Sequence, residues 1–299
     1  MATRGKIIKT ETPEQLRLLR PMVVRRTELL LDRSKCCGCN VCRLVCPREA
    51  ISVTVGQVTD GRMTAAPVVN IDESLCSLCG ECAASCPVHA YEMTVDGKPE
   101  IPVIRFEAFP NLLRANRVNQ AAASASTETG YIAACPTGSI SATIERDEEG
   151  HVTAVSQVEV NRRTCISCTR CMEQGPAGAF TVTKPYQGRV YLDVSLCPEG
   201  CQACADVCPS KTIRYDGARV SVDERFCIHC GACEHICPAP GAIRNERRLI
   251  MHTPIESGAW AKALDKLVSY REVSAEYDRK GQVRRRRAVV KGLLREMVE

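Results

Sequence analysis

The sequence contains few of the side chains from which a large hydrophobic core is built. Only 4% of its 299 residues are aromatic, with one Trp and four Phe. A single large domain normally buries many such side chains, whereas small domains bury too little apolar surface and need additional links. Because the chain has 21 cysteines, we expect cysteine chemistry to supply those links.

Other absences exclude whole classes of protein. The first twenty residues are charged and have no apolar core, so we expect no secretory signal. No apolar run approaches the roughly 20 residues of a membrane span, which predicts a cytoplasmic protein. No paired carboxylates, Ser–His arrangement or glycine-rich phosphate loop stands out, which argues against an enzyme. In an intracellular protein, closely and regularly spaced cysteines indicate metal ligands rather than disulfides.

Four stretches carry the pattern C-x2-C-x2-C-x3-C-P, one of them with an extra residue after its first cysteine. This pattern is typical of bacterial ferredoxins that bind 4Fe-4S clusters. The four runs are Cys36, Cys39, Cys42 and Cys46; Cys76, Cys79, Cys82 and Cys86; Cys197, Cys201, Cys204 and Cys208; and Cys227, Cys230, Cys233 and Cys237.

Two other metal sites fit the pattern less well. A zinc site would show two C-x2-C pairs separated by a longer loop. The spacing from Cys197 to Cys204 also resembles a radical-SAM signature, which would leave one iron open for substrate. However, Cys237 is available as a fourth ligand, and the sequence has no alternation of strands and helices that would build a barrel.

The spacing also predicts which cysteines share a cluster. Three thiolates on one tight loop reach three corners of an iron–sulfur cube, and the fourth ligand comes from a distant cysteine. In two-cluster ferredoxins the fourth cysteine of each run binds the cluster of the other run. The predicted ligand sets are therefore Cys36, Cys39, Cys42 and Cys86; Cys76, Cys79, Cys82 and Cys46; Cys197, Cys201, Cys204 and Cys237; and Cys227, Cys230, Cys233 and Cys208.

A fifth run, CISCTRCMEQGP, has Gly175 where the fourth cysteine should stand. Cys46 and Cys76 are 30 residues apart, and so are Cys135 and Cys165. Cys135 is therefore the remaining fourth cysteine of a degraded run, and it completes a set with Cys165, Cys168 and Cys171. The ligands of the neighbouring cluster are all absent, because their positions hold Ala125, Glu128, Tyr131 and Gly175. The prediction is five 4Fe-4S clusters on 20 cysteines, with Cys37 left as a packed, inert thiol.

These runs predict an α+β fold of tandem two-cluster ferredoxin modules with a helical C-terminal extension. After each Cys-Pro, and after Gly175-Pro176, we expect a short helical turn and then a strand. The predicted parts are an N-terminal arm (1–26), module 1 with two clusters (27–98), a linker (99–111), degenerate module 2 with one cluster (112–186), module 3 with two clusters (187–250) and a helical basic tail (251–299).

Three further expectations concern the segments outside the runs. The linker is bounded by prolines and should be extended, and residues 113–131 should form a helix on the side of the lost cluster. From about Ile255 the pattern becomes helical, with Trp260, Leu264 and Leu267 on one face. This helix should either pack on module 3 or dock a partner.

The charge does not indicate nucleic-acid binding. The formal net charge is +5, and Arg284 to Arg287 form a basic run. An oxidised cluster core carries about 2+ and its four thiolates 4−, so five clusters would bring the net charge to about −5. With so few aromatic residues, the arginines are better explained as a solvated face or a contact with an acidic subunit.

A cluster with four thiolate ligands has no iron position free for a substrate, so its chemistry is one-electron transfer. A free ferredoxin is usually one short module, which makes a fixed relay subunit the preferred interpretation. A freely diffusing multi-cluster ferredoxin remains the alternative.

The segments LCPEGCQACADVCPSKTIRYDG, VSVDERFCIHCGACEHICP and RLIMHTPIESGAW resemble the polyferredoxin subunits of tungsten or molybdenum formylmethanofuran dehydrogenases from methanogenic archaea. The resemblance implies that the chain carries low-potential electrons from a heterodisulfide reductase or a ferredoxin to a separate catalytic subunit. Members of that family can carry more clusters than this chain. A polyferredoxin of a hydrogenase or heterodisulfide reductase complex is the second possibility.

Overall fold

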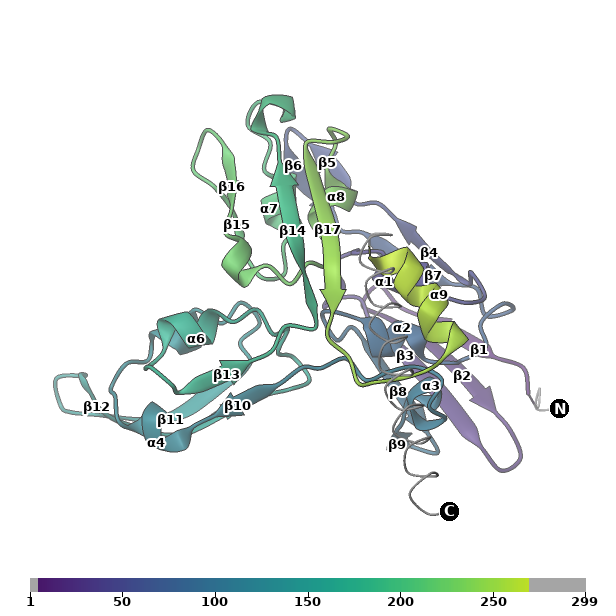
Figure 1. Ribbon diagram of the computed structural model, residues 1–299, viewed down its shortest axis with the longest axis horizontal. Coiled ribbons are helices and arrows are strands. Elements are labelled where there is room, and N and C mark those ends of the chain that lie inside the picture. The colour runs from purple at the N-terminus through teal and green to yellow at the C-terminus, as the bar shows by residue number, and fades with distance from the viewer. Residues whose placement is uncertain (1–4, 269–299) are drawn as a thin grey trace, which may run out of the picture.

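One pattern of strand pairing repeats three times in the computed structural model, which describes residues 5–268 (Figure 1). Each repeat has an outer antiparallel pair, formed by its first and last strands, and an inner antiparallel pair. The outer pairs are β3 (Arg26–Asp32) with β8 (Tyr91–Val95), β10 (Asn116–Val118) with β13 (Phe180–Val182), and β14 (Tyr186–Leu192) with β17 (Ile243–Ile250). The inner pairs are β4 (Ile51–Thr54) with β7 (Val68–Ile71), β11 (Ile140–Arg146) with β12 (Val152–Val160), and β15 (Ile213–Tyr215) with β16 (Val220–Val222).

The short helices of the repeats lie within the cysteine runs. Each begins two residues after the second position of its run and ends before the fourth position. These helices are α1 (Val41–Val45), α2 (Glu81–Ser85), α5 (Gly130–Ala133), α6 (Arg170–Gln174), α7 (Ala203–Val207) and α8 (Ala232–Ile236). The strand predicted after each Cys-Pro and after Gly175-Pro176 is present in all six cases. A short turn precedes the strand, as in the hydrogen bond from Glu49 N–H to Cys46 O at 3.3 Å, while the α-helix of each run lies before the fourth position. Two 3-10 turns, Val194–Leu196 and Glu224–Phe226, lead into the runs of module 3.

The N-terminal residues belong to module 1, so the prediction of a separate arm is wrong. Strands β1 (Ile8–Glu11) and β2 (Gln15–Pro21) extend the outer pair into a five-stranded sheet, which ends with β9 (Lys98–Pro99). Leu16 lies opposite Leu31, and Leu18 opposite Leu29, and all four side chains are buried. These leucines form one face of the module's core, which the sheet covers from outside.

Two segments differ from their predicted structures. The linker is not extended, because Pro102–Arg105 forms helix α3 with its proline at the helix start. Residues 113–131 do not form one helix: they contain strand β10, helix α4 (Gln120–Ser124) and the start of α5. In α4 the Asn119 side chain accepts a hydrogen bond from Ala122 N–H and caps the helix.

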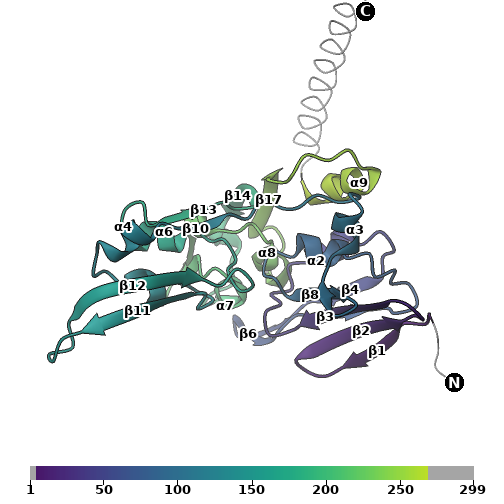
Figure 2. The same ribbon diagram turned by 90° about the horizontal axis from the view of Figure 1, so that it is seen from below.

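The C-terminal helix α9 (Gly258–Leu267) packs on module 1, so the expectation of a contact with module 3 is wrong. It lies against α1, and Trp260, Leu264 and Leu267 are buried on one face as predicted. The Trp260 ring contacts Phe109 edge-on, with centroids 5.0 Å apart. In Figure 2, α2 lies between α9 and the sheet of module 1. The predicted basic tail from residue 269 onward, with Arg284 to Arg287, lies outside the described residues.

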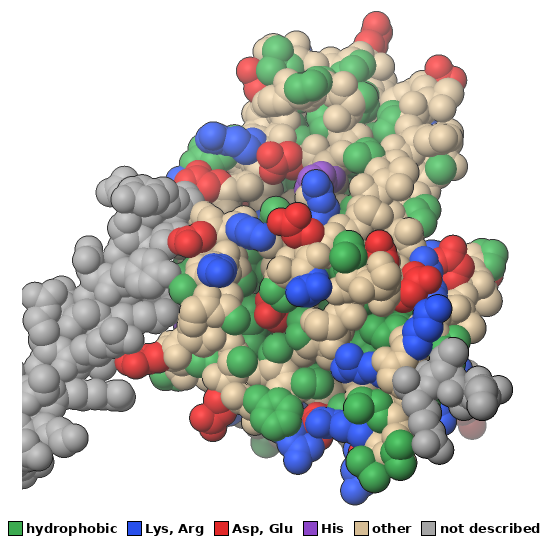
Figure 3. All heavy atoms as spheres, turned by 90° about the vertical axis from the view of Figure 1, so that its right-hand side faces the viewer, with side chains coloured by type: hydrophobic (Ala, Val, Ile, Leu, Met, Phe, Trp, Pro, Cys, Tyr) green, Lys and Arg blue, Asp and Glu red, His purple; other side chains and the backbone are tan. Residues whose placement is uncertain are grey.

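A hairpin of module 1 reaches over module 3. Strands β5 (Gln57–Thr59) and β6 (Arg62–Ala65) form this hairpin, and β6 lies next to α7. Buried residues of modules 1 and 3, together with Ile166 and Cys168 from the cysteine run of module 2, form one continuous cluster. Figure 3 shows the face of module 1, where charged side chains of both signs are mixed and hydrophobic side chains gather towards the lower edge. Within residues 5–268, no helix is both long and apolar enough to cross a membrane.

Candidate iron-sulfur cluster sites

The loops that carry the cysteines share one backbone conformation. In four of them φ is positive two residues after the first cysteine and one residue after the second; the residues concerned are Gly38, Leu78, Ser167 and His229, and Asn40, Gly80, Thr169 and Gly231. This conformation turns backbone N–H groups inward. Leu78 N–H donates to Cys76 Sγ at 3.4 Å, and His229 N–H to Cys227 Sγ at 3.3 Å. Converging N–H groups favour a negative charge, so these loops suit thiolates.

The run with the extra residue is held by the hairpin from module 1. Gln202 N–H donates to Gly61 O at 2.8 Å, and the Asp206 carboxylate accepts bonds from Arg62 Nε at 2.9 Å and Met63 N–H at 3.0 Å. A Cβ on Gly61 would lie 2.6 Å from Cys201 Cα, so only glycine permits this close approach. The β5–β6 hairpin therefore covers the irregular loop.

The structure brings the cysteines together in the five groups that the spacing predicts. Burial raises the pKa of one thiol in each group, and the other thiols of the group lie close enough to raise it further, as for Cys42, Cys82, Cys171, Cys204 and Cys233. We name each group by its first cysteine. They are the Cys36 set (with Cys39, Cys42 and Cys86), the Cys76 set (with Cys79, Cys82 and Cys46), the Cys165 set (with Cys168, Cys171 and Cys135), the Cys197 set (with Cys201, Cys204 and Cys237) and the Cys227 set (with Cys230, Cys233 and Cys208).

Three of these sets line cavities with all four of their thiols. These small cavities lie at the Cys165 set, the Cys76 set and the Cys227 set. Among the described residues, no three His, Cys, Asp or Glu side chains are grouped closely enough to hold a single metal ion. The thiols therefore surround a space rather than a point, which suits a polyatomic cluster better than zinc.

The electrostatics of the sets also fit an iron–sulfur core. All 21 cysteines are free thiols. Burial raises the pKa of Cys36 and of Cys227 to about 12, and neighbouring thiolates add to the shift. Four thiolates would repel one another in such a site unless a positive centre lay between them. A 4Fe-4S core supplies that positive charge and takes four thiolates, so the residues present fit this group.

Cys135 occupies the same structural position as the fourth cysteine of the complete runs. In module 1, Cys46 Sγ accepts a hydrogen bond from Ala50 N–H, and Cys86 Sγ from Ala90 N–H, each at 3.3 Å. Cys135 Sγ accepts the equivalent bond from Ser139 N–H, also at 3.3 Å. The identical offset of four residues supports the alignment that the sequence spacing predicts.

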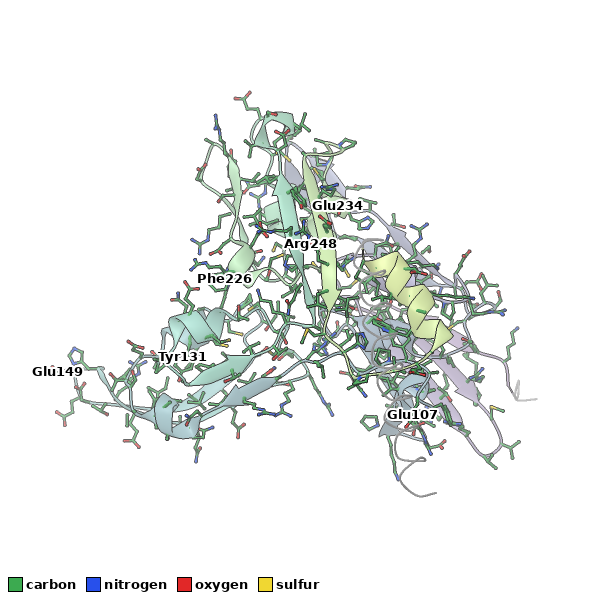
Figure 4. All side chains as sticks on the ribbon, viewed as in Figure 1. Glu107, Tyr131, Glu149, Phe226, Glu234 and Arg248 are labelled. Atoms are coloured by element: carbon green, nitrogen blue, oxygen red, sulfur yellow. The ribbon has the colours of Figure 1, made fainter. Side chains whose placement is uncertain are left out.

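Two aromatic side chains pack together in module 2 where the predicted ligand positions hold no cysteine. Tyr131, at one of these positions, is fully buried (Figure 4). Its ring centroid lies 4.9 Å from that of Phe180, which also lines the cavity of the Cys165 set. A Cβ on Gly175, at another lost position, would lie 2.8 Å from both Cys171 O and the Phe180 ring. Gly178 keeps the positive φ found at Glu49 and His89, three residues after the fourth cysteine of each run in module 1. The backbone of this half-module is retained while its cavity is filled.

Cys37 lies at the junction of modules 1 and 3. Its side chain is buried and shares hydrogen bonds with Cys39 of the Cys36 set and Cys230 of the Cys227 set. These bonds raise the pKa of Cys37, and they lower the pKa of Cys39 and of Cys230, the latter to about 7. Cys37 is packed, as predicted, but it connects two cysteine loops, and no feature of the sequence indicates this contact.

Partly buried cations connect module 2 to the other modules. Arg114 donates to Cys86 O and to His89 Nε2, both at 2.6 Å, and it also lies near Cys165. Lys184 donates to Cys227 O at 3.1 Å and lies near Cys168. The Cys165 set therefore adjoins both the Cys36 set and the Cys227 set. Sequence reasoning misses these two side chains because they stand outside the cysteine runs.

Comparisons with known proteins agree with this geometry. Residues 35–90 and 189–238 each match a family model described as a 4Fe-4S dicluster domain. A ferredoxin of Methanocaldococcus jannaschii is 38% identical over 59 residues, which are 19% of this chain and 94% of that ferredoxin. A polyferredoxin of Methanothermus fervidus is 28% identical over 96 residues, which are 29% of this chain and 22% of that protein.

A solved structure is similar over most of the chain. It is a chain of the formate dehydrogenase, heterodisulfide reductase and formylmethanofuran dehydrogenase complex of Methanospirillum hungatei, with a TM-score of 0.75 and 27% identity over 90% of this chain and 93% of that chain. In contrast, the chain spans less than a quarter of the length of the first curated relatives that it matches. Together, the cysteine geometry and these matches show that the chain belongs to the family of 4Fe-4S dicluster ferredoxins and is an iron–sulfur electron-transfer protein.

Proposed function

We propose that the chain holds five 4Fe-4S clusters, one on each of the five cysteine sets. The grouping of the thiols, the inward N–H groups and the cavities at three sets support this assignment. Each set supplies four thiolates, which leaves no iron position open to a substrate. We therefore infer that the chain is not itself an enzyme and that each cluster passes single electrons to its neighbours.

The junction at Cys37 carries the proposal that the clusters form one continuous relay. The Cys36 set and the Cys227 set meet there through hydrogen bonds of one thiol. Within module 1 the Cys76 set adjoins the Cys36 set, since Cys82 lies near Cys42, and within module 3 Cys233 lies near Cys204. Electrons can thus pass from the Cys76 set to the Cys197 set through modules 1 and 3. Module 2 contacts this route at its middle but is not needed to complete it.

The proposed role is that of a relay subunit in a cytoplasmic redox complex. It would carry low-potential electrons from a heterodisulfide reductase or ferredoxin to the tungsten or molybdenum catalytic subunit of formylmethanofuran dehydrogenase. The structural likeness to a chain of the Methanospirillum hungatei complex, over 90% of this chain, supports this role. A polyferredoxin of a hydrogenase or heterodisulfide reductase complex is the second candidate, supported by the similarity to the Methanothermus fervidus polyferredoxin.

The number of clusters can be measured directly. Five fully ligated clusters predict about 20 irons and about 20 sulfides per chain after anaerobic preparation. Iron and sulfide analysis tests this value, with zinc measured on the same sample. A content near 16 or 24 irons would contradict the assignment, and stoichiometric zinc would favour the alternative metal.

The pair Cys36 and Cys37 tests the register of the first run. Cys36→Ser should lose about four irons per chain, because it removes a ligand. Cys37→Ser should keep all its iron, since the hydroxyl can still donate a hydrogen bond across the junction. Iron analysis and low-temperature EPR of both variants measure the outcome. Iron loss in Cys37→Ser alone would show that the register is shifted by one residue.

Module 2 tests the rule that the fourth cysteine of one run binds the cluster of the other run. Cys135→Ser should lose about four irons and lower the melting temperature of the holoprotein, because the Cys165 set then lacks its fourth ligand. Gly175→Cys should gain no cluster, since Tyr131 and Phe180 fill the space and the other ligand positions hold no thiols. Gly258→Cys, at a position with open space around it, controls for the addition of a thiol. A gain of iron in Gly175→Cys, or full iron in Cys135→Ser, would refute the assignment.

The relay role predicts electron transfer without turnover. The isolated, cluster-loaded chain should be reduced by titanium(III) citrate, with all five clusters detected by EPR, yet it should not convert carbon dioxide, formate or hydrogen. Activity assays and EPR on the same preparation make the comparison. Turnover of any of these substrates by the isolated chain would overturn the relay proposal.

A further inference from the structure

The turn between β2 and β3 exposes three consecutive apolar side chains. Met22 is 55% exposed, Val23 76% and Val24 90%. The turn closes with a hydrogen bond from Met22 N–H to Arg25 O at 2.8 Å, and the strands on either side are fully paired. Exposed hydrophobic residues that stand singly are ordinary, but a contiguous apolar tip often marks a contact with another protein.

The fold itself gives no reason for valine at the tip. Two-residue hairpin turns favour Asn, Asp and Gly, and β-branched residues are poor turn formers. The core face of β2 and β3 is already complete with Leu16, Leu18, Leu29 and Leu31. The apolar side chains at the tip therefore contribute little to the module and are available to a partner.

The tip is connected to the cysteine loop of the Cys76 set. Arg20 continues the inward face of β2 and donates to Ser77 O at 3.2 Å, next to Cys76. Cys76 and Cys79 are only partly buried, and the nearby Leu75 is 41% exposed. The cluster proposed for the Cys76 set would therefore lie near the surface, beside the tip. This set is also at one end of the proposed relay.

Positive charge surrounds the tip. The basic side chains outnumber their acidic partners: Arg17 and Arg26 share the carboxylate of Glu28, and Arg25 and Arg105 share that of Glu100. The Asp96 carboxylate accepts a hydrogen bond from the backbone N–H of Arg26. Arg26 remains 57% exposed and Arg25 37% exposed at their side chains. Basic and hydrophobic side chains lie side by side along the lower edge of the face in Figure 3. A partner surface that complements the tip would be acidic around an apolar centre.

We propose that the β2–β3 turn, with Met22, Val23 and Val24 flanked by Arg25 and Arg26, is the docking site for an acidic redox protein that exchanges electrons with the cluster of the Cys76 set. One electron passes from the reduced cluster of the partner to this cluster, so the partner is oxidised and the chain reduced by the same amount. This inference rests on the proposed relay function. The apolar tip gives the complex a dry centre, and the arginines steer the approach of the partner.

The test uses the full, cluster-loaded chain and a small acidic ferredoxin with two 4Fe-4S clusters as the electron donor. The donor is first reduced with titanium(III) citrate, and the second-order rate of electron transfer is measured by stopped flow. Arg25→Glu with Arg26→Glu should lower this rate roughly tenfold at low ionic strength, with the difference shrinking in salt. Val23→Ser with Val24→Ser should lower it by a factor of about five, with weaker salt dependence. Iron content confirms that each variant is loaded.

Two control variants separate docking from general effects. Arg214→Glu with Arg219→Glu makes the same change in net charge at the exposed β15–β16 hairpin, and Val55→Ser with Val68→Ser removes two exposed apolar side chains elsewhere on module 1. Both should leave the rate unchanged. Equal slowing by a control and by the matching tip variant would overturn the proposal, because only overall charge or hydrophobicity would then matter.

The remaining outcomes identify other occupants. If the tip variants keep the full rate but turn a dimer into a monomer in sedimentation, the tip binds a second copy and the proposal is wrong. If they keep the full rate but lose binding to vesicles of anionic phospholipid, the tip binds a lipid surface and the proposal is equally wrong. Failure of titanium(III) citrate to reduce the wild-type clusters would instead refute the relay function, which distinguishes the two conclusions.

Discussion

The geometry of a cubic iron–sulfur cluster, bound by cysteines of one short loop, constrains most of this structure. Three evenly spaced thiolates reach three corners, and the fourth ligand has to come from another loop, so two runs become one unit. The outer and inner strand pairs support this arrangement. A strand follows each Cys-Pro, and the thiol of the fourth cysteine lies near the cysteines of the partner run. Backbone N–H groups then point at the sulfurs, as at Cys46, Cys86 and Cys135. Under the proposed assignment, Cys135 belongs to the Cys165 set, which explains why it stands in a stretch without three other cysteines.

A second constraint follows from the charge of the clusters. Each proposed cluster brings about two net negative charges into a poorly hydrated interior. Partly buried cations lie where these charges would be closest together: Arg114 lies near Cys86 and Cys165, and Lys184 lies near Cys168 and Cys227. Both also donate to backbone carbonyls of the adjacent module. The same side chains therefore balance charge and fix the distance between cysteine sets, which is what an electron relay requires of its frame.

The sequence predicts the features that depend on local spacing and misses those that depend on tertiary contacts. The cysteine groups and the strand after each Cys-Pro follow from fixed offsets within one or two loops. The short strands β1 and β2 give a weak periodic signal that resembles an arm, and their place is decided by pairing with β3. The apolar face of Trp260 and Leu264 is predictable but its partner is not, because an apolar stripe specifies burial and not the surface that covers it. The contact of Cys37 is equally hidden, since Cys230 is nearly two hundred residues away.

Module 2 separates the structural role of a cluster from its role in electron transfer. A small module normally needs its clusters as links, yet under the proposed assignment Tyr131 and Phe180 pack where module 2 has no second cluster. Burial of the Phe180 ring contributes roughly 1.5–3 kcal/mol. Hydrophobic packing can therefore take over the stabilising role of a lost cluster. It cannot carry electrons, so under the proposed assignment the far end of module 2 has no conducting site. The cluster site that remains is the one between the Cys36 and Cys227 sets, where a redox centre is in contact with the main route. The outer site of module 2 has no thiols, whereas the inner site, the Cys165 set, has all four. This pattern is expected if module 2 supports the middle of the relay and does not lengthen it.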